Sequence, residues 1–111
     1  MQLSSDIWVY ALVRRAQLGG AFATIVRKGD ARGGAVLVKI VNRRTDEAQL
    51  WAEAVGAHGR SVWMQPKAGA DERDLDAYLE RAARIDPDIW VVEIEDPDAR
   101  RFLTDAGEEM D

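Results

Sequence analysis

The chain contains no cysteine and a single histidine among its 111 residues. The lack of cysteine excludes disulfides, cysteine-ligated zinc, iron–sulfur clusters and a thiol nucleophile. A single histidine excludes any site that needs two of them. No apolar run approaches the ~18 residues needed to span a bilayer. Because 47% of the residues are apolar and 32% are charged, we expect a folded domain rather than a disordered chain.

Length and composition predict one domain in the cytoplasm. A chain of this size is too small for two good cores, so we expect a single α+β domain over residues 1–104 and a polar, frayed tail over residues 105–111. The first five residues carry no Lys or Arg, and the apolar segment Ile7–Val13 leads into Arg14 and Arg15 rather than into a cleavage site. This is not the pattern of a secretory signal, and with the lack of disulfides it predicts a cytoplasmic protein.

Periodicity and turn residues predict two main helices and five strands. Apolar residues at helical spacing predict a helix over residues 5–18, stopped by Gly19-Gly20. A second helix is predicted to begin after Asp71 and to end before Asp86-Pro87-Asp88. The strands are predicted at residues 22–28, 35–41, 48–55, 61–65 and 89–95, and a short C-terminal helix from Asp96 through Leu103.

The order of these elements is helix, four strands, helix, strand and short helix. Consecutive strands joined by short loops usually pair antiparallel. We therefore expect an α+β fold with a mostly antiparallel five-stranded sheet, on which the two main helices pack.

Three segments of the chain resemble a known family. They are Ser5-Asp6-Ile7-Trp8-Val9, Gly33-Gly34-Ala35-Val36 and Asp86–Asp96. The resemblance is to the bacterial family catalogued as domain of unknown function 1491, and it covers most of the chain. It implies a small stand-alone bacterial cytoplasmic protein. It implies no activity, cofactor or catalytic residue, so no functional role is transferred from it.

Carboxylates gather around the last predicted strand. Hard cations such as Mg²⁺ or Mn²⁺ favour clustered oxygen ligands, so one hypothesis is a divalent-metal-dependent phosphoester hydrolase with Asp88, Glu93 and Glu95 as ligands. The other interpretation is structural, because in an Asp-Pro-Asp unit the first Asp caps, Pro fixes φ and the second Asp suits a helix start. That interpretation predicts no cofactor and no catalytic residue. The six carboxylates lie at Asp86, Asp88, Glu93, Glu95, Asp96 and Asp98.

Two further polar features have a functional and an ordinary interpretation. His58 lies in a predicted hairpin loop, where it could act as a base for Ser61 or be an ordinary loop residue. Three arginine pairs suit phosphate or carboxylate binding, which allows an anion or nucleic-acid binder as a second alternative. The chain carries a net charge of −5, so we do not expect a nucleic-acid partner. The pairs are Arg14-Arg15, Arg43-Arg44 and Arg100-Arg101.

The aromatic residues indicate an interaction surface. If the hairpin is centred on Ala57, Trp51 lies opposite Trp63 on the more polar face of both strands. Ile7 and Tyr10 lie outside the apolar stripe of the first helix. The two indoles could be covered by a helix, or they could form a docking platform together with Ile7 and Tyr10. The leading hypothesis is therefore a non-catalytic protein-interaction or regulatory module that binds a protein partner or forms a homodimer.

Overall fold

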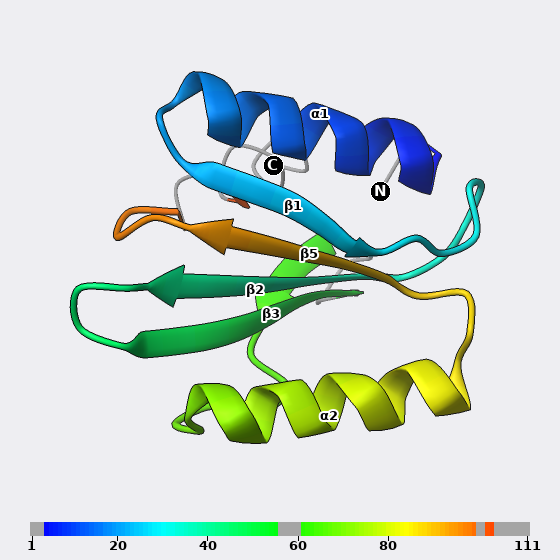
Figure 1. Cartoon of the computed structure of the whole chain (residues 1–111). Helices are drawn as coiled ribbons and strands as arrows, with labels where there is room; N and C mark the ends of the chain where they lie inside the picture. Colours follow the sequence, from blue (N-terminus) through cyan, green and yellow to red (C-terminus); the bar gives the residue numbers. More distant parts are fainter. Residues whose placement is uncertain (1–3, 56–60, 100–101, 104–111) are drawn as a thin grey trace.

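The computed structural model describes residues 4–55, 61–99 and 102–103. Two helices lie on opposite faces of a five-stranded sheet (Figure 1). The elements are α1 (Ser5–Leu18), β1 (Phe22–Arg27), β2 (Val36–Asn42), β3 (Glu47–Val55), β4 (Ser61–Met64), α2 (Glu72–Ile85) and β5 (Trp90–Glu95). These bounds confirm the predicted elements of this part of the chain. The short helix predicted from Asp96 through Leu103 is described in part: residues 97–99 form a turn and Phe102 and Leu103 are helical. Residues 100–101 and the predicted tail over residues 105–111 lie outside the described residues.

Local chemistry explains the start of α2 and the end of α1. The side chain of Asp71 accepts a hydrogen bond from the Asp74 backbone N–H and caps α2. After the C-terminal end of α1, Gly20 takes a left-handed conformation with φ of 92°, which glycine adopts without a steric cost. One stripe of α1, including Val9 and Leu12, is buried, as the spacing predicts.

The sheet is mixed rather than mostly antiparallel, which corrects the prediction. Its strand order is β1-β5-β2-β3-β4, and β5 pairs antiparallel with β1 but parallel with β2. After β4, α2 covers one face of the sheet and returns the chain so that β5 enters between β1 and β2 (Figure 1). The apolar residues on both faces of β5 are consistent with this central position, because helices cover a central strand on both sides.

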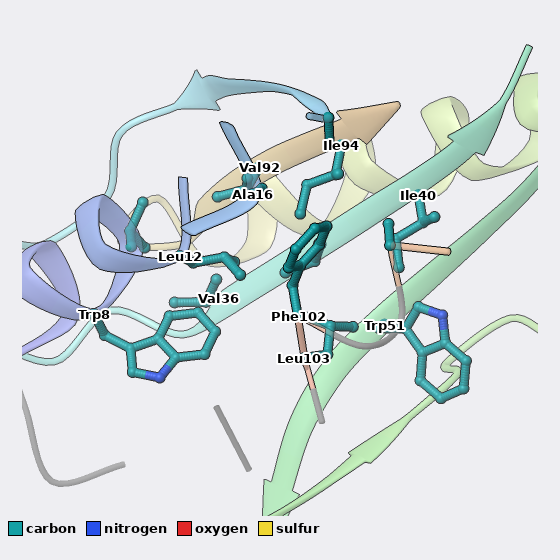
Figure 2. Close-up of a cluster of buried hydrophobic side chains, with 14 of the residues drawn as sticks. Trp8, Leu12, Ala16, Val36, Ile40, Trp51, Val92, Ile94, Phe102 and Leu103 are labelled. Atoms are coloured by element: carbon teal, nitrogen blue, oxygen red, sulfur yellow. The ribbon is translucent and has the colours of Figure 1, made fainter. Parts of the chain in front are cut away.

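The sheet separates two apolar cores. On the α1 face, Trp8 and Leu12 pack against Val38, Val92 and neighbouring residues. Phe102 and Leu103 belong to the same buried cluster (Figure 2). On the α2 face, Leu75 packs against the smaller cluster of Leu37, Leu50, Ile89 and Val91. The side chains of β2 alternate between the two cores, which explains why this strand reads as an unbroken apolar run around Lys39.

The predicted direct pairing of Trp51 with Trp63 is wrong. In the β3–β4 register, Trp63 lies opposite Glu53, and Ala52 lies opposite Met64. The hairpin is therefore two residues out of the predicted register, a shift that keeps both indoles on the α1 face. Trp63 lies against Trp8 instead, with 5.5 Å between the ring centroids.

Candidate functional site

The structure separates the three candidate metal ligands. Glu93 and Glu95 lie on β5 and face basic side chains, whereas Asp88 lies in the loop before β5. The Asp88 carbonyl accepts a hydrogen bond from the Asp30 backbone N–H at 2.9 Å. Within residues 4–55, 61–99 and 102–103, no group of three or more His, Cys, Asp or Glu residues is placed to hold a metal ion. The described geometry therefore does not unite Asp88, Glu93 and Glu95 in one site.

Both Asp-Pro-Asp units form tight local turns. The side chain of Asp86 accepts a hydrogen bond from the Asp88 backbone N–H at 3.0 Å. Asp96 accepts from the Asp98 N–H in the same way, at 2.8 Å. An Asp side chain that bonds the backbone two residues on is a common turn device. These contacts support the structural interpretation of the repeated tripeptide.

A buried lysine organises the carboxylates of the α2 face. Lys39 is 4% exposed, and its Nζ lies 2.7 Å from both Glu72 Oε2 and Asp76 Oδ1 and 3.4 Å from Glu93 Oε1. Arg43 extends the group, since its guanidinium lies 2.9 Å from Glu72 Oε1 and 3.5 Å from Glu95 Oε2. We call these residues the Lys39 network. It links α2 to β2 and β5 through ion pairs.

The charges of the Lys39 network stabilise one another. Burial would lower the pKa of Lys39, but hydrogen bonds to Asp76 and Glu72 and the charge of Glu93 together raise it above its usual value. Hydrogen bonds from Lys39 and Arg43 lower the pKa of Glu72. The surrounding carboxylates therefore favour the charged form of Lys39. The signal for this network in the sequence was Lys39, the one charged residue within an apolar strand. The carboxylates that pair with Lys39 could not be identified from the sequence.

A polar cleft of ≈ 970 Å³ lies at the carboxyl ends of β2 and β5. Among the described residues, its lining includes five carboxylates and no Lys or Arg. The negative charge of these described lining residues disfavours phosphate and other anions. The lining carboxylates are those of Asp46, Glu47, Asp71, Asp96 and Asp98.

The remaining polar candidates are dispersed or lie outside the described residues. Arg15 donates to the Phe102 carbonyl on the α1 side at 3.2 Å, whereas Arg43 belongs to the Lys39 network on the opposite face. The structure therefore does not gather these two arginine pairs. Residues 100–101 and His58 lie outside the described residues, so the third pair and the base hypothesis for Ser61 remain sequence predictions.

The three family-like segments meet at one junction. Ser5 Oγ donates to the Gly34 carbonyl at 2.6 Å, and the Trp90 indole N–H donates to the Asp30 carbonyl at 2.8 Å. A Cβ at Gly34 would overlap the Asp88 carbonyl oxygen. The start of α1, the loop before β2 and the loop before β5 are thus closely packed, which gives these segments a structural role.

The residues of the predicted interaction surface differ in their exposure. Ile7 and Tyr10 are exposed on α1, as the helical pattern predicts. Trp51, in contrast, is only 8% exposed, and Trp63 is half-buried, with its indole N–H donating to the Leu103 carbonyl at 2.9 Å. The two indoles therefore form no exposed platform. Trp51 is part of the α1-side core (Figure 2), and Trp63 packs against that core and bonds to Leu103.

The most exposed apolar strand is β1, which the sequence analysis did not single out. Phe22 is 78% and Val26 is 60% exposed, and both alternate with Ala23 and Ile25, which pack against the α1-side core. We call Phe22, Thr24 and Val26 the β1 patch. In the described sheet β1 has a neighbouring strand on one side only. An apolar edge strand of this kind is a ready template for another strand.

The chain belongs to the family described as "Protein of unknown function (DUF1491)". The family model matches residues 3–104, which confirms the resemblance of the three segments. The mixed α+β fold is likewise shared with solved members of that family. No curated protein matches the chain.

Three solved structures are similar to this chain over most of its length. A crystal structure of a DUF1491 family protein from Caulobacter crescentus CB15 is 67% identical, with a TM-score of 0.85, covering 94% of this chain and 95% of that chain. An NMR structure of a DUF1491 family protein from the same organism is 68% identical, with a TM-score of 0.82 and coverage of 92% and 93%. The solution structure of protein Atu0922 from A. tumefaciens is 32% identical, with a TM-score of 0.75 and coverage of 88% and 89%.

Among the described residues, neither helix is long and apolar enough to cross a membrane.

Proposed function

We propose that this chain is a non-catalytic protein-interaction or regulatory module that binds an extended segment of a partner protein along β1. The observation that carries this proposal is the exposure of Phe22 and Val26 on a strand at the edge of the sheet. α2 packs against β3 and not against the edge strand β1, so it leaves the β1 patch uncovered (Figure 1).

Strand addition explains why both the backbone and the side chains of β1 matter. The outer edge of a strand offers a row of N–H and C=O groups, and main-chain hydrogen bonds to an added strand supply affinity. Side chains at alternate positions supply specificity, because they lie on one face of the extended sheet. Phe22 and Val26 occupy such positions, with Thr24 between them.

The partner segment should be apolar at alternate positions and acidic at one end. Apolar side chains would pack against Phe22 and Val26, since cross-strand aromatic and β-branched pairs stabilise a sheet. β1 ends at Arg27, which is followed by the exposed Lys28. A carboxylate opposite this basic end would complement its charge.

The first turns of α1 supply a second exposed apolar area, on the opposite face of the sheet from the β1 patch. α1 packs against β1, and Ile7 and Tyr10 project from it into solvent. The Tyr10 ring makes an edge contact with Trp90 at 6.1 Å, which holds it close to the start of β5. We assign Ile7 and Tyr10 to a second part of the interaction surface, which a partner bound along β1 would reach from the α1 face.

Selection from a library of displayed random peptides tests the proposal. The wild-type protein serves as bait, and Phe22→Lys and Ile85→Lys serve as matched variants, because Ile85 is 85% exposed but lies on α2 and not on the edge strand β1. We expect the selected peptides to show apolar residues at alternate positions. We expect their affinity to fall at least tenfold for Phe22→Lys and to stay unchanged for Ile85→Lys.

Selected peptides that bind all three proteins equally would remove β1 as the interaction surface. The same conclusion would follow if the wild-type bait enriched no peptide with an alternating apolar pattern.

A further inference from the structure

We propose that a second copy of this chain is a partner for β1, and that the two β1 strands pair antiparallel about a two-fold axis at Thr24. This inference rests on the proposed function and names the partner. It follows from the alternation of exposed and half-buried residues along Phe22–Arg27, from the place of β1 at the edge of the described sheet, and from the charges at the two ends of the strand.

The faces of the sheet restrict the possible registers. A two-fold axis perpendicular to the sheet continues each face of one copy into the same face of the other. A residue of the β1 patch must then lie opposite a residue of the same set, because side chains alternate between faces. With Thr24 on the axis, Phe22 lies opposite Val26 of the second copy, and Val26 lies opposite its Phe22.

This register pairs the exposed side chains with one another. Two Phe–Val pairs flank a central Thr–Thr pair, and both kinds of pair stabilise neighbouring strands. On the other face, Ala23 falls opposite Ile25 of the second copy, beside the α1-side core. Registers centred on Ala23 or Ile25 are less complementary, since they place Thr24 opposite an apolar residue and leave one apolar residue of the patch near the end of the pairing.

Charge favours the antiparallel direction. β1 ends at the basic pair Arg27-Lys28, and its first residue, Phe22, lies beside Glu95 on β5. Antiparallel pairing brings the basic end of each copy towards the end of the other copy that carries Glu95 and Asp96. Parallel pairing would place the two basic ends together, and like charges side by side destabilise a strand pair.

The strand also limits how strong the pairing can be. The register between β1 and β5 shifts between Ile25 and Arg27, so Val26 lies at the bulge, and its pairing with Phe22 of the second copy is the less regular end of the interface. The carbonyl of Ala23 accepts a long 3.4 Å hydrogen bond from Gln17 Nε2, which a second strand would displace. A pair of five-residue strands is smaller than the interface of a standard stable complex. We therefore expect a weak dimer, with a dissociation constant in the micromolar range.

Single cysteines test the register in a chain that has none of its own. Residues directly opposite on antiparallel strands have Cα atoms about 4.5–5.5 Å apart, within the range that a disulfide spans. Thr24→Cys should therefore form a disulfide-linked dimer under mild oxidation, as read on a non-reducing gel and by mass spectrometry. Phe22→Cys and Val26→Cys alone should not, because each lies about 14 Å from its own copy along the strand. Mixed together, those two variants should form a linked heterodimer.

The exposed turn residue Thr45, changed to Cys, measures linkage by random collision. We expect Thr24→Cys to form at least tenfold more dimer than Thr45→Cys at the same protein concentration. Equal yields would overturn the proposal. Linkage of Phe22→Cys or Val26→Cys alone, at the yield of Thr24→Cys, would overturn the two-fold register.

Sedimentation of the wild type across protein concentration separates this inference from the proposed function. We expect reversible self-association that Phe22→Lys abolishes and Ile85→Lys does not. A wild type that stays monomeric up to millimolar concentration would refute the second copy as partner. The displayed-peptide selection would still decide whether β1 binds extended segments of other proteins.

Discussion

The indole rings of Trp8 and Trp63 lie 5.5 Å apart, with their planes tilted by 35°. This contact joins the first helix to the last strand of the β3–β4 hairpin. The Trp63 N–H also donates to the Leu103 carbonyl at 2.9 Å. Trp63 therefore connects three segments that are distant in the sequence.

Trp63→Leu should destabilise the fold by about 2 kcal/mol, because it removes both the aromatic contact and the hydrogen bond. Trp63→Phe is the matched control, since it keeps a ring against Trp8 but cannot donate, and about 1 kcal/mol is expected. Urea unfolding followed by circular dichroism measures both losses. Equal stability of Trp63→Leu and the wild type would contradict the structural role of this residue.

Lys39→Met should lower the free energy of unfolding by about 2 kcal/mol. The change leaves Glu72, Asp76 and Glu93 without their shared cation, and these carboxylates then repel one another. The loss is smaller than for a fully buried pair because all three are partly exposed to water. Denaturant unfolding of Lys39→Met, Glu72→Gln and the double variant forms a double-mutant cycle. Purely additive losses would show that Lys39 and Glu72 are not coupled.

The Lys39 network should make the free energy of unfolding depend on pH in the acidic range. Hydrogen bonds from Lys39 and Arg43 lower the pKa of Glu72 in the folded protein from its usual value of 4.5. Its contribution is therefore fully present above that usual value and is lost as the pH falls through the folded-state pKa. Between pH 6 and pH 3, Glu72→Gln should lose less stability than the wild type. Parallel curves of unfolding free energy against pH would count against this linkage.

Alkaline pH should act on Lys39 in the opposite sense. Its pKa is raised in the folded protein, so its contribution is present below the unfolded value of about 10.4 and is lost as the pH rises through the folded-state pKa. The network should therefore remain intact across the neutral range. Thermal unfolding at pH 6 to pH 9 checks this, with Lys39→Met showing the same pH dependence as the wild type over that interval.

Gly34→Ala should destabilise the junction of the three family-like segments by about 2 kcal/mol or more. The added Cβ would overlap the Asp88 carbonyl, which is backbone and cannot rotate away. Gly33→Ala is the neighbouring control, because a Cβ there meets no atom within 4 Å. Thermal unfolding should show a clear drop only for Gly34→Ala. A similar melting temperature for both variants would mean that the close packing at Gly34 is not required.

Divalent metal should leave stability unchanged. Glu93 and Glu95 face Lys39 and Arg43, and Asp88 lies apart from them. A metal bound at 100 times its dissociation constant would add about 2.7 kcal/mol, so Mg²⁺ and Mn²⁺ titrations followed by thermal unfolding are sensitive to it. A rise in melting temperature that Asp88→Asn and Glu93→Gln both remove would restore the metal-dependent hydrolase hypothesis.

Much of the secondary structure could be predicted because its causes are local. The stripe of Val9 and Leu12, the stop at Gly20 and the cap at Asp71 depend on neighbouring residues. The position of β5 could not be predicted in this way. Its insertion beside β1 and its parallel pairing with β2 depend on where α2 carries the chain.

The candidate site likewise has features that follow from local sequence and features that depend on tertiary structure. The exposure of Ile7 and Tyr10 follows from helical spacing, whereas the fate of Trp51 and Trp63 depends on the hairpin register and on what packs above it. The β1 patch was missed because its residues look like those of any buried strand. Only the sheet order shows that Phe22 and Val26 lie on an edge that α2 does not cover.

The amino-acid sequence by itself determined the helices, the extent of the strands and the absence of thiol chemistry. It also determined the family membership that three short segments suggested. Tertiary structure decided which strands are neighbours, which carboxylates surround Lys39 and which apolar side chains remain in water. The physical reason is the distance along the chain over which each kind of interaction acts. Backbone propensity, capping and periodicity act over a few residues, whereas strand pairing and ion pairing join residues whose separation along the chain carries no information about their separation in space.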